Sequence, residues 1–362
     1  MKFTIIRSKL LDGLQTVQNI VAGRSTMQIL SNALIKGEDG KLWLTSTDLD
    51  LTVKCCIECE ITVPGSTTLP VRRLASIVKE LPDDRVTVEI DDDDVATVQC
   101  GSAFFKINGL SMRDFPPVPV ADGEYSYRMD QAVLRDMLRK TSYAASLDQT
   151  RKALNGVMMV FKEGKVTVIA TDGRRLALIE NEGEFSTDAE TEMILPLKTV
   201  TELMHLLGQG DLKIFAQKNQ AVFDLGNRTL SSKLVDGVYP NYRQVIPASC
   251  NERVVVEREL LMTAMRRISL IATEKANTSQ LTFNDNHLTV SINTDVGEAR
   301  ETLPIKYAGN QISVIFNAEY VIDPLKNLDS DEVYLEMNDG RSPVVFKSNI
   351  PFLYVLMPLL IK

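Results

Sequence analysis

The sequence has no long hydrophobic run, and this excludes a protein that crosses a membrane with helices. None of its apolar stretches reaches the length of about eighteen residues that a membrane helix needs. Charges at Lys2, Arg7, Lys9 and Asp12 interrupt the amino-terminal segment, so it lacks the apolar core of a secretion signal. We therefore expect a cytoplasmic protein without a membrane partner.

Cysteine and histidine are too scarce for a structural zinc site. The chain has 5 cysteines, three of them in the cluster Cys55, Cys56 and Cys59, and only 2 histidines. A structural zinc ion takes about four such ligands, and there is no second cysteine pair. The odd cysteine count agrees with reduced thiols in the cytoplasm. We expect a strand over residues 51–63 with the cysteines packed inside, and neither a metal nor a cofactor.

Catalytic motifs are missing as well. The chain has no glycine-rich phosphate loop, no G-x-S-x-G nucleophile elbow and no H-E-x-x-H motif. One alternative is a hydrolase that uses Asp172, but no convergent base accompanies this aspartate. Another is a β-rich protein that binds a small ligand or a polysaccharide, but a single tryptophan, Trp43, offers little of an aromatic platform. We expect a binding or scaffolding protein rather than an enzyme.

Basic residues are fewer than acidic residues. The 362 residues include 40 Lys and Arg against 48 Asp and Glu, which gives a formal net charge of −8. Such a balance disfavours electrostatic attachment to nucleic acid. With 44% apolar residues and 14 prolines, the composition is that of a globular protein of two or three domains without disordered tracts.

What the sequence does contain is a threefold repeat. A turn, an alternating strand, a Thr-Asp pair and a second strand recur in GKLWLTSTDLDLTV, GKVTVIATDGRRLAL and NHLTVSINTDVGEAR. The aspartates of these pairs, Asp48, Asp172 and Asp295, are roughly 120 residues apart. Because the pair recurs at the same turn, we interpret its carboxylate as an Asx-type cap on local backbone amides.

Two amphipathic helices accompany each copy of this hairpin. Apolar residues spaced at i, i+3, i+4 and i+7 predict helices near residues 9–21, 68–81, 130–143, 194–207, 257–271 and 315–328. Short strands follow, and we interpret the acidic run 91–94 between two of them as a solvated hairpin tip. The fold class is α+β, with three repeated domains of two helices and about eight antiparallel strands each. Segments rich in proline and small polar residues place the domains at 1–121, 122–246 and 247–362.

Four motifs of the chain resemble a known family. DGRRLAL, the preceding TRKALNGVMM, DGVYPNYRQVIP and the terminal YVLMPL resemble the bacterial sliding clamp, the β subunit of DNA polymerase III, and the resemblance covers the whole chain in order. It implies a head-to-tail homodimeric ring of six domains that encircles double-stranded DNA without sequence preference. It also implies a processivity factor, near the nucleoid, whose partners are the replicative polymerase α subunit, the clamp loader, and other polymerases and repair factors.

Helix dimensions agree with a dimeric ring. Six helices, each about 10 Å wide, would enclose an opening of only about 9 Å, whereas twelve would enclose roughly 28 Å. A DNA duplex is about 20 Å across, so only the dimer could surround it. Basic residues on the helices, joined by Arg24, Arg151 and Lys152 from the resemblance, are expected to face the DNA: Lys9, Arg72, Arg73, Lys79, Arg135, Arg139, Lys140, Lys198, Arg266, Arg267 and Lys275.

The resemblance also implies a hydrophobic cleft for short peptides of partner proteins. Matched residue by residue, the cleft comprises Leu154, Thr171, Gly173, Arg174, Arg175, Leu176, Pro240, Val245, Asn317, Tyr320, Val344, Val355, Met357, Pro358 and Leu359. The stems of the two arginines would wall the pocket while their charged heads stay in water. Only the middle repeat has GRR at this turn, which favours a site over a requirement of the fold.

The chain departs from the family pattern in three features, which involve four positions. Arg174 stands where a histidine is familiar, and Gln244 replaces a frequent arginine. Lys152 and Ala153 occupy the place of an aromatic pair. The first two differences bear on peptide preference, and the third bears on contact with DNA.

Overall fold

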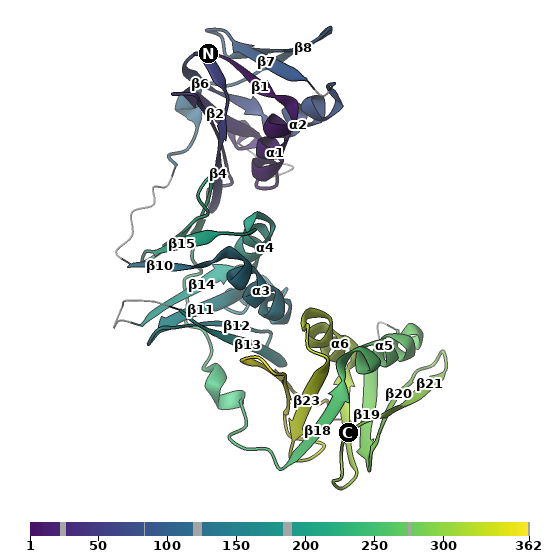
Figure 1. The fold of residues 1–362 in the computed structure, drawn as a ribbon. Helices are drawn as coiled ribbons and strands as arrows, with labels where there is room; N and C mark the ends of the chain where they lie inside the picture. The colour runs from purple at the N-terminus through teal and green to yellow at the C-terminus, as the bar shows by residue number, and fades with distance from the viewer. Residues whose placement is uncertain (22–26, 83, 119–124, 184–189, 274–276, 361–362) are drawn as a thin grey trace. The chain divides into compact units, whose positions relative to one another are not determined.

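The computed structural model of the chain describes residues 1–21, 27–82, 84–118, 125–183, 190–273 and 277–360. It confirms an α+β fold of helices and antiparallel sheets (Figure 1). Two compact units divide the chain. The N-terminal unit comprises residues 1–135 and 201–234, and the C-terminal unit comprises residues 136–200 and 235–362. Among the described residues, no helix is long and apolar enough to cross a membrane.

The N-terminal unit contains two sheets. A five-stranded sheet has the order β5 (Glu60–Val63), β1 (Lys2–Ile6), β7 (Arg85–Ile90), β8 (Val95–Cys100), β9 (Ala103–Asn108). An eight-stranded sheet joins the first two repeats in the order β10 (Tyr125–Asp130), β15 (Asp211–Ala216), β16 (Gln220–Asp224), β17 (Arg228–Lys233), β4 (Leu51–Glu58), β3 (Lys41–Thr47), β2 (Asn32–Glu38), β6 (Gly65–Pro70). The pairing of β17 with β4 therefore closes an edge that each repeat would otherwise expose.

The C-terminal unit repeats this arrangement. Its eight-stranded sheet has the order β14 (Thr191–Pro196), β11 (Gly156–Lys162), β12 (Lys165–Thr171), β13 (Arg175–Glu182), β25 (Phe352–Leu356), β24 (Val344–Lys347), β23 (Glu332–Met337), β18 (Glu252–Glu257). Its four-stranded sheet has the order β21 (Glu298–Pro304), β20 (His287–Asn293), β19 (Thr278–Asn284), β22 (Ile312–Asn317). The pairing of β13 with β25 joins the second repeat to the third.

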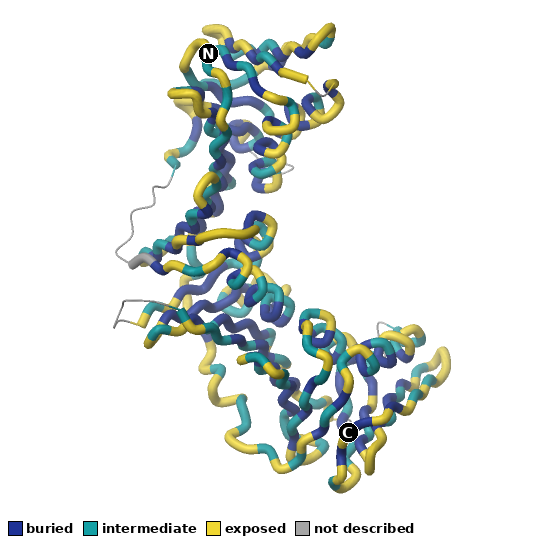
Figure 2. The backbone as a smooth tube through the Cα atoms, viewed as in Figure 1, coloured by how far each residue is buried: buried dark blue, intermediate teal, exposed yellow. Residues whose placement is uncertain are grey.

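All six predicted helices are present within a few residues of their expected bounds. They are α1 (Arg7–Gln18), α2 (Val71–Glu80), α3 (Gln131–Thr141), α4 (Leu197–Leu206), α5 (Arg258–Ile268) and α6 (Ala318–Asn327). The spacing that predicted them is also the spacing of their buried residues, as in Leu10, Gly13, Leu14 and Val17 of α1. Buried residues follow the strands and one side of each helix, while exposed residues gather at turns (Figure 2). All six end one to three residues before the predicted bound, and short 3-10 turns follow α3 and α5.

The single strand predicted over residues 51–63 is wrong, because the structure divides it into β4 and β5. The amide of Cys59, between the two strands, donates to the carbonyl of Gly40 at 3.0 Å. Cys55 is buried as expected, but Cys56 and Cys59 are only half-buried. The acidic run 91–94 does form the hairpin tip between β7 and β8, where Asp91 accepts hydrogen bonds from two amides of the turn.

The hydrogen bonds of the three Thr-Asp turns show whether the threonine or the aspartate has the same role in every repeat. Asp48 and Asp172 each accept two backbone amides, as an Asx cap requires. In the third turn the Thr294 hydroxyl accepts the amide of Val296, and the exposed Asp295 accepts no amide from the described residues. The threonine hydroxyl bonds the turn in all three copies, so the interpretation of the carboxylate as the shared cap is correct for two repeats and wrong for the third.

This difference gives a first prediction. Asp48→Ala should speed amide hydrogen exchange at its turn by about fivefold, the equivalent of a lost hydrogen bond of about 1 kcal/mol. Asp295→Ala should leave exchange at the third turn unchanged, whereas Thr294→Val should speed it. Equal effects of the two aspartate substitutions would show that the third carboxylate caps the turn in solution.

Candidate functional site

An apolar cluster in the C-terminal unit underlies the predicted cleft. Its buried members come from β11, β12, β13, β14 and β25 and from the segment after residue 234: Met158, Val160, Ile169, Leu176, Ile194, Tyr239 and Val355. Half-buried Ala153, Leu178, Val235, Tyr242, Ile246 and Leu353 pack around them. Leu176 lies opposite Val355 across the β13–β25 pair. The cluster therefore combines residues of the second and third repeats in one continuous hydrophobic contact.

The predicted cleft residues divide by exposure into a buried base and an accessible rim. Thr171, Leu176, Val344 and Val355 are buried. Leu154, Arg175, Asn317, Tyr320 and Pro358 are half-buried. Gly173, Arg174, Pro240, Val245, Met357 and Leu359 are exposed, and Val245, Met357 and Leu359 are 44%, 41% and 38% exposed. The exposed members are therefore accessible to a ligand, while the buried members are not.

Backbone hydrogen bonds fix the carboxyl-terminal segment along this surface. The amide of Met357 donates to the carbonyl of Arg174 at 3.0 Å. Two residues later, the amide of Leu359 donates to the carbonyl of Ile315 on β22 at 2.8 Å. The middle-repeat turn thus holds Met357, and β22 holds Leu359 two residues later. These bonds fix the carboxyl-terminal segment, which the family resemblance assigns to the cleft together with the turn.

The two arginines of the turn have different environments. Arg174 is exposed, as expected. Arg175 is not: its side chain is only 10% exposed, so the prediction that both charged heads stay in water is wrong for Arg175. Its Nε donates to Asp172 at 3.0 Å, Nη1 to Asp323 at 2.5 Å, and Nη2 to the carbonyl of Tyr143 at 2.7 Å. Desolvation lowers the pKa of Arg175, but its acidic partners and Tyr354 outweigh that effect and raise it.

Aromatic rings surround this guanidinium. The Arg175 Cζ lies 4.1 Å from the ring centre of Tyr320 and 5.8 Å from that of Tyr143, distances that permit cation–π attraction. Tyr143 packs against Tyr354 with ring centres 6.0 Å apart, and the Tyr354 hydroxyl donates to the Tyr320 carbonyl at 2.7 Å. Burial raises the pKa of both Tyr143 and Tyr354, so their hydroxyls remain protonated. The Tyr143 hydroxyl is buried and has no hydrogen-bond partner among the described residues.

The Asp172 carboxylate accepts hydrogen bonds within the turn and is not available as a catalytic group. One carboxylate oxygen accepts the amides of Arg174 and Arg175, and the other accepts Nε of Arg175. The Asp172 side chain is only 14% exposed. A general acid or base must reach a substrate proton, and these contacts already occupy both oxygens. The hydrolase alternative therefore has no support in this arrangement.

The basic residues expected to face DNA lie in both units and differ in how far their charge is already neutralised. Arg72, Arg73, Lys79 and Arg135 of the N-terminal unit are exposed, with Arg72 donating to the Val21 carbonyl. Exposed residues of the C-terminal unit are Arg151, Lys152, Lys198, Arg266 and Arg267, and Lys9 on α1 is exposed as well. Arg24 and Lys275 lie outside the described residues.

Arg139, Lys140 and Arg267 form internal ion pairs. Arg139 and the buried Lys140 both pair with Asp136 on their own helix and with Asp329 beyond α6. Hydrogen bonding from Arg139 lowers the pKa of Asp329. Arg267 pairs with Glu301 through Nε at 2.9 Å and Nη2 at 2.5 Å. Helical spacing can reveal Asp136, but it could not reveal Asp329 or Glu301, because these two partners lie on other elements.

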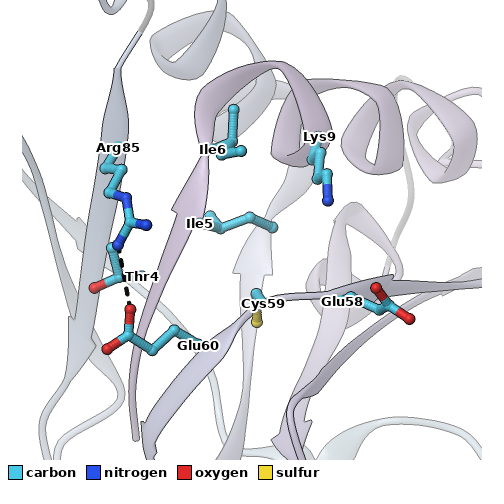
Figure 3. Close-up of a pocket in the computed structure, with 8 residues that line it drawn as sticks. All are labelled: Thr4, Ile5, Ile6, Lys9, Glu58, Cys59, Glu60 and Arg85. Atoms are coloured by element: carbon cyan, nitrogen blue, oxygen red, sulfur yellow. Dashed lines mark hydrogen bonds and ion pairs between the residues drawn. The ribbon is translucent and has the colours of Figure 1, made fainter.

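Sequence reasoning also missed two hollows in the N-terminal unit. The smaller, of about 160 Å³, is lined by Thr4, Ile5, Ile6, Lys9, Glu58, Cys59, Glu60 and Arg85 (Figure 3). Arg85 pairs with Glu60 across it at 3.3 Å. The larger, of about 530 Å³, shares Lys9 and Glu58 and reaches Trp43, whose ring faces Lys54. Burial raises the pKa of Cys59 to about 11, so this thiol is a poor nucleophile near neutral pH.

Family models and relatives match the chain throughout its length. Models of the N-terminal, central and C-terminal domains of the DNA polymerase III beta subunit match residues 1–119, 128–241 and 243–359. The beta sliding clamp of Synechocystis sp. is 31% identical over 99% of both chains, and that of Synechococcus elongatus is 30% identical over 100% of both.

Solved structures agree over the whole chain as well. A sliding clamp from Pseudomonas aeruginosa, bound to griselimycin, is 31% identical with a TM-score of 0.96. A sliding clamp from Bacillus subtilis is 26% identical, also with a TM-score of 0.96. Each comparison covers 100% of both chains. The similarity therefore extends to all three repeats.

The unpartnered Tyr143 hydroxyl gives a second prediction. A buried hydroxyl without a partner costs about 1 to 3 kcal/mol, so Tyr143→Phe should raise the free energy of unfolding of the C-terminal unit by about 1 kcal/mol. Tyr354→Phe should lower it by a similar amount, because it removes the bond to the Tyr320 carbonyl. Calorimetric unfolding of the full chain measures both changes. A lower unfolding temperature for Tyr143→Phe would mean that its hydroxyl is bonded.

Proposed function

This chain belongs to the DNA polymerase III beta subunit family, the beta sliding clamps, and on that premise we propose how it holds DNA and its partners. It is a processivity factor without catalytic activity. Two copies form a head-to-tail ring of six domains, 1–121, 122–246 and 247–362 in each chain, around double-stranded DNA. The ring works in the cytoplasm near the nucleoid.

The accessible rim above a buried apolar cluster carries the proposal of a peptide site. Short peptides of the replicative polymerase α subunit, the clamp loader, and other polymerases and repair factors would bury Val245, Met357 and Leu359 against the cluster. The flexible thioether of Met357 suits several ligand side chains. A Pseudomonas aeruginosa relative binds griselimycin, which supports ligand binding by clamps of this fold. Arg174 and Gln244, both exposed, would contribute polar contacts at the rim.

Exposed apolar residues on an open sheet edge support the dimer. β9 ends the five-stranded sheet, and Phe104 and Phe105 on it are 58% and 38% exposed. An open edge with exposed aromatic residues favours pairing with another chain. Leu270, in the third repeat, is 83% exposed and offers apolar surface for the opposite end of a partner copy. A head-to-tail ring would cover both surfaces.

DNA contact is proposed to be topological, with weak electrostatic contacts. The net charge of −8 opposes tight binding to open duplex, while exposed arginines such as Arg73, Arg135 and Arg266 on helices can meet phosphates. A ring needs no strong contact, because its DNA leaves only when the ring opens or an end passes through. Weak contacts then favour sliding.

The peptide site gives a third prediction. Met357→Ala combined with Leu359→Ala should weaken griselimycin and polymerase-peptide binding about tenfold or more, because each lost side chain removes about 1 kcal/mol of apolar contact. Isothermal titration calorimetry of the full chain measures the affinity. Deleting residues 357–362, which removes one side of the rim, should abolish binding without loss of the fold.

Two further variants control this experiment. Val63→Ala removes a side chain of similar exposure, 47%, from β5 in the N-terminal unit, and should leave affinity unchanged. Leu176→Ala is unsuitable as a pure binding variant, because Leu176 is 1% exposed and its loss leaves a core cavity costing about 2 to 5 kcal/mol of stability. Unchanged affinity in both Met357→Ala with Leu359→Ala and the deletion variant would place the peptide site elsewhere.

Encirclement gives a fourth prediction. Loaded onto a nicked circular DNA by the clamp loader with ATP, the chain should stay bound through gel filtration at moderate salt. Cutting the circle once should release it, because the ring then slides off an end without breaking a specific contact. The free protein should run at about twice its 40.3 kDa mass, as a dimer.

A variant that introduces a charge at the proposed dimer edge tests whether retention on DNA depends on the dimer. Phe104→Asp should lower the mass to that of one chain and abolish retention on the circle, since an aspartate cannot be buried unpaired in an apolar interface. Retention that linearisation does not reduce, with both ends unblocked, would contradict encirclement.

A further inference from the structure

Helix α6 carries residues of the proposed peptide site and a residue bound to Arg175. Asn317 caps the helix by accepting the amide of Glu319 at 2.9 Å, and Tyr320 lies in the first turn. Asp323, three residues beyond Tyr320, accepts Nη1 of Arg175. Positions i and i+3 share one face of a helix, so Tyr320 and Asp323 both face the guanidinium. The same face of α6 therefore holds Tyr320, a residue of the proposed peptide site, and Asp323, which binds Arg175 inside the protein.

All three nitrogens of the Arg175 side chain already donate to groups within the protein. Each of its three nitrogens donates to a different group, on Asp172, Asp323 and Tyr143. Tyr320 covers the guanidinium at 4.1 Å. The side chain is only 10% exposed, which leaves little space for a peptide carboxylate to reach the remaining N–H groups. Its charge thus acts inside the protein.

We propose that Arg175 is a positioning residue for the peptide site. It ties the Thr171–Arg175 turn to the first turns of α6, and so sets the placement of Arg174 and Met357 relative to Asn317 and Tyr320. The inference rests on the proposed peptide site. Peptide binding and the Arg175–Asp323 ion pair are then thermodynamically linked. The ion pair favours the arrangement of the turn and α6 that binds the peptide, and a bound peptide stabilises the ion pair.

A second ion cluster keeps α6 attached when Asp323 is changed. Asp329, just beyond the helix, pairs with both Arg139 and Lys140 of α3. Leu325 and Val321 are buried within the helix itself. Loss of the Asp323 carboxylate should therefore loosen the first turns of α6 without releasing the helix. This makes Asp323 a more informative position than Arg175, whose removal also leaves Asp172 unpaired.

The test measures griselimycin affinity and hydrogen exchange in the full chain. Asp323→Asn should weaken griselimycin binding about tenfold, within the usual range of coupling between linked sites. Asp323→Glu, which keeps the carboxylate, should restore most of the affinity. Arg175→Lys should weaken binding similarly, since one ammonium cannot reproduce the planar three-way contact. Combining Arg175→Lys with Asp323→Asn should add little, because both break the same contact.

Hydrogen exchange separates positioning from simple loss of stability. Griselimycin should slow amide exchange across residues 318–327 in the unchanged chain, and this protection should disappear in Asp323→Asn. Two controls should keep both affinity and protection: Val63→Ala, on β5 of the N-terminal unit, and Asp329→Asn, at the second ion cluster. A merely structural role would lower the unfolding temperature of Asp323→Asn while leaving affinity and protection intact, and that result would overturn the inference.

Failure of the peptide site itself gives a different pattern. If the unchanged chain does not bind griselimycin, or if Met357→Ala with Leu359→Ala binds it normally, the site proposed above is wrong and the inference falls with it. If those variants behave as expected but Asp323→Asn binds as tightly as the unchanged chain, only the role of Arg175 is refuted.

Discussion

The antiparallel pairing of β13 with β25 places Arg175 opposite Leu356 and Leu176 opposite Val355, and the candidate site follows from this register. Because a sheet edge leaves backbone groups unpaired, the last strand of the third repeat closes the edge of the second. The chain continues directly from β25 into Met357, whose amide bonds to Arg174. A strand pairing thus creates a surface that neither repeat could form alone. In the N-terminal unit, β17 pairs with β4 in the same way.

A buried cation stabilises this junction only because its partners surround it. Moving a guanidinium out of water costs several kcal/mol, and a buried pair is favourable only when its remaining hydrogen bonds are satisfied. Arg175 meets that condition with two carboxylates, one carbonyl and the face of Tyr320. Removing any one of them would leave a charge in a poorly hydrated place. The turn, η3 (Ser142–Ala144) and α6 are therefore held by a single side chain that few residues could replace.

Local patterns predicted the fold but not the partners of charged side chains. Helical spacing and the recurring Thr-Asp hairpin identified the six helices and the threefold repeat, since both signals depend on residues near in sequence. The cleft list came from family resemblance, and the structure shows two contacts between its members, Met357 with Arg174 and Leu176 opposite Val355. The environment of Arg175 could not be predicted, because Asp323 lies 148 positions away and on another repeat. The same reason hid Asp329 from the interpretation of Arg139 and Lys140.

These internal pairs also bear on how an acidic chain can surround DNA. A cation that already pairs with a carboxylate, as Arg139 and Arg267 do, gains less from a phosphate, because it must first give up its partner. Each phosphate neutralised by a free cation releases counterions and steepens the dependence of binding on salt. Internal pairing therefore reduces the number of strong phosphate contacts without removing basic residues from the helices. A ring held by topology benefits from this weakness, because strong contacts would have to break at every step along the duplex.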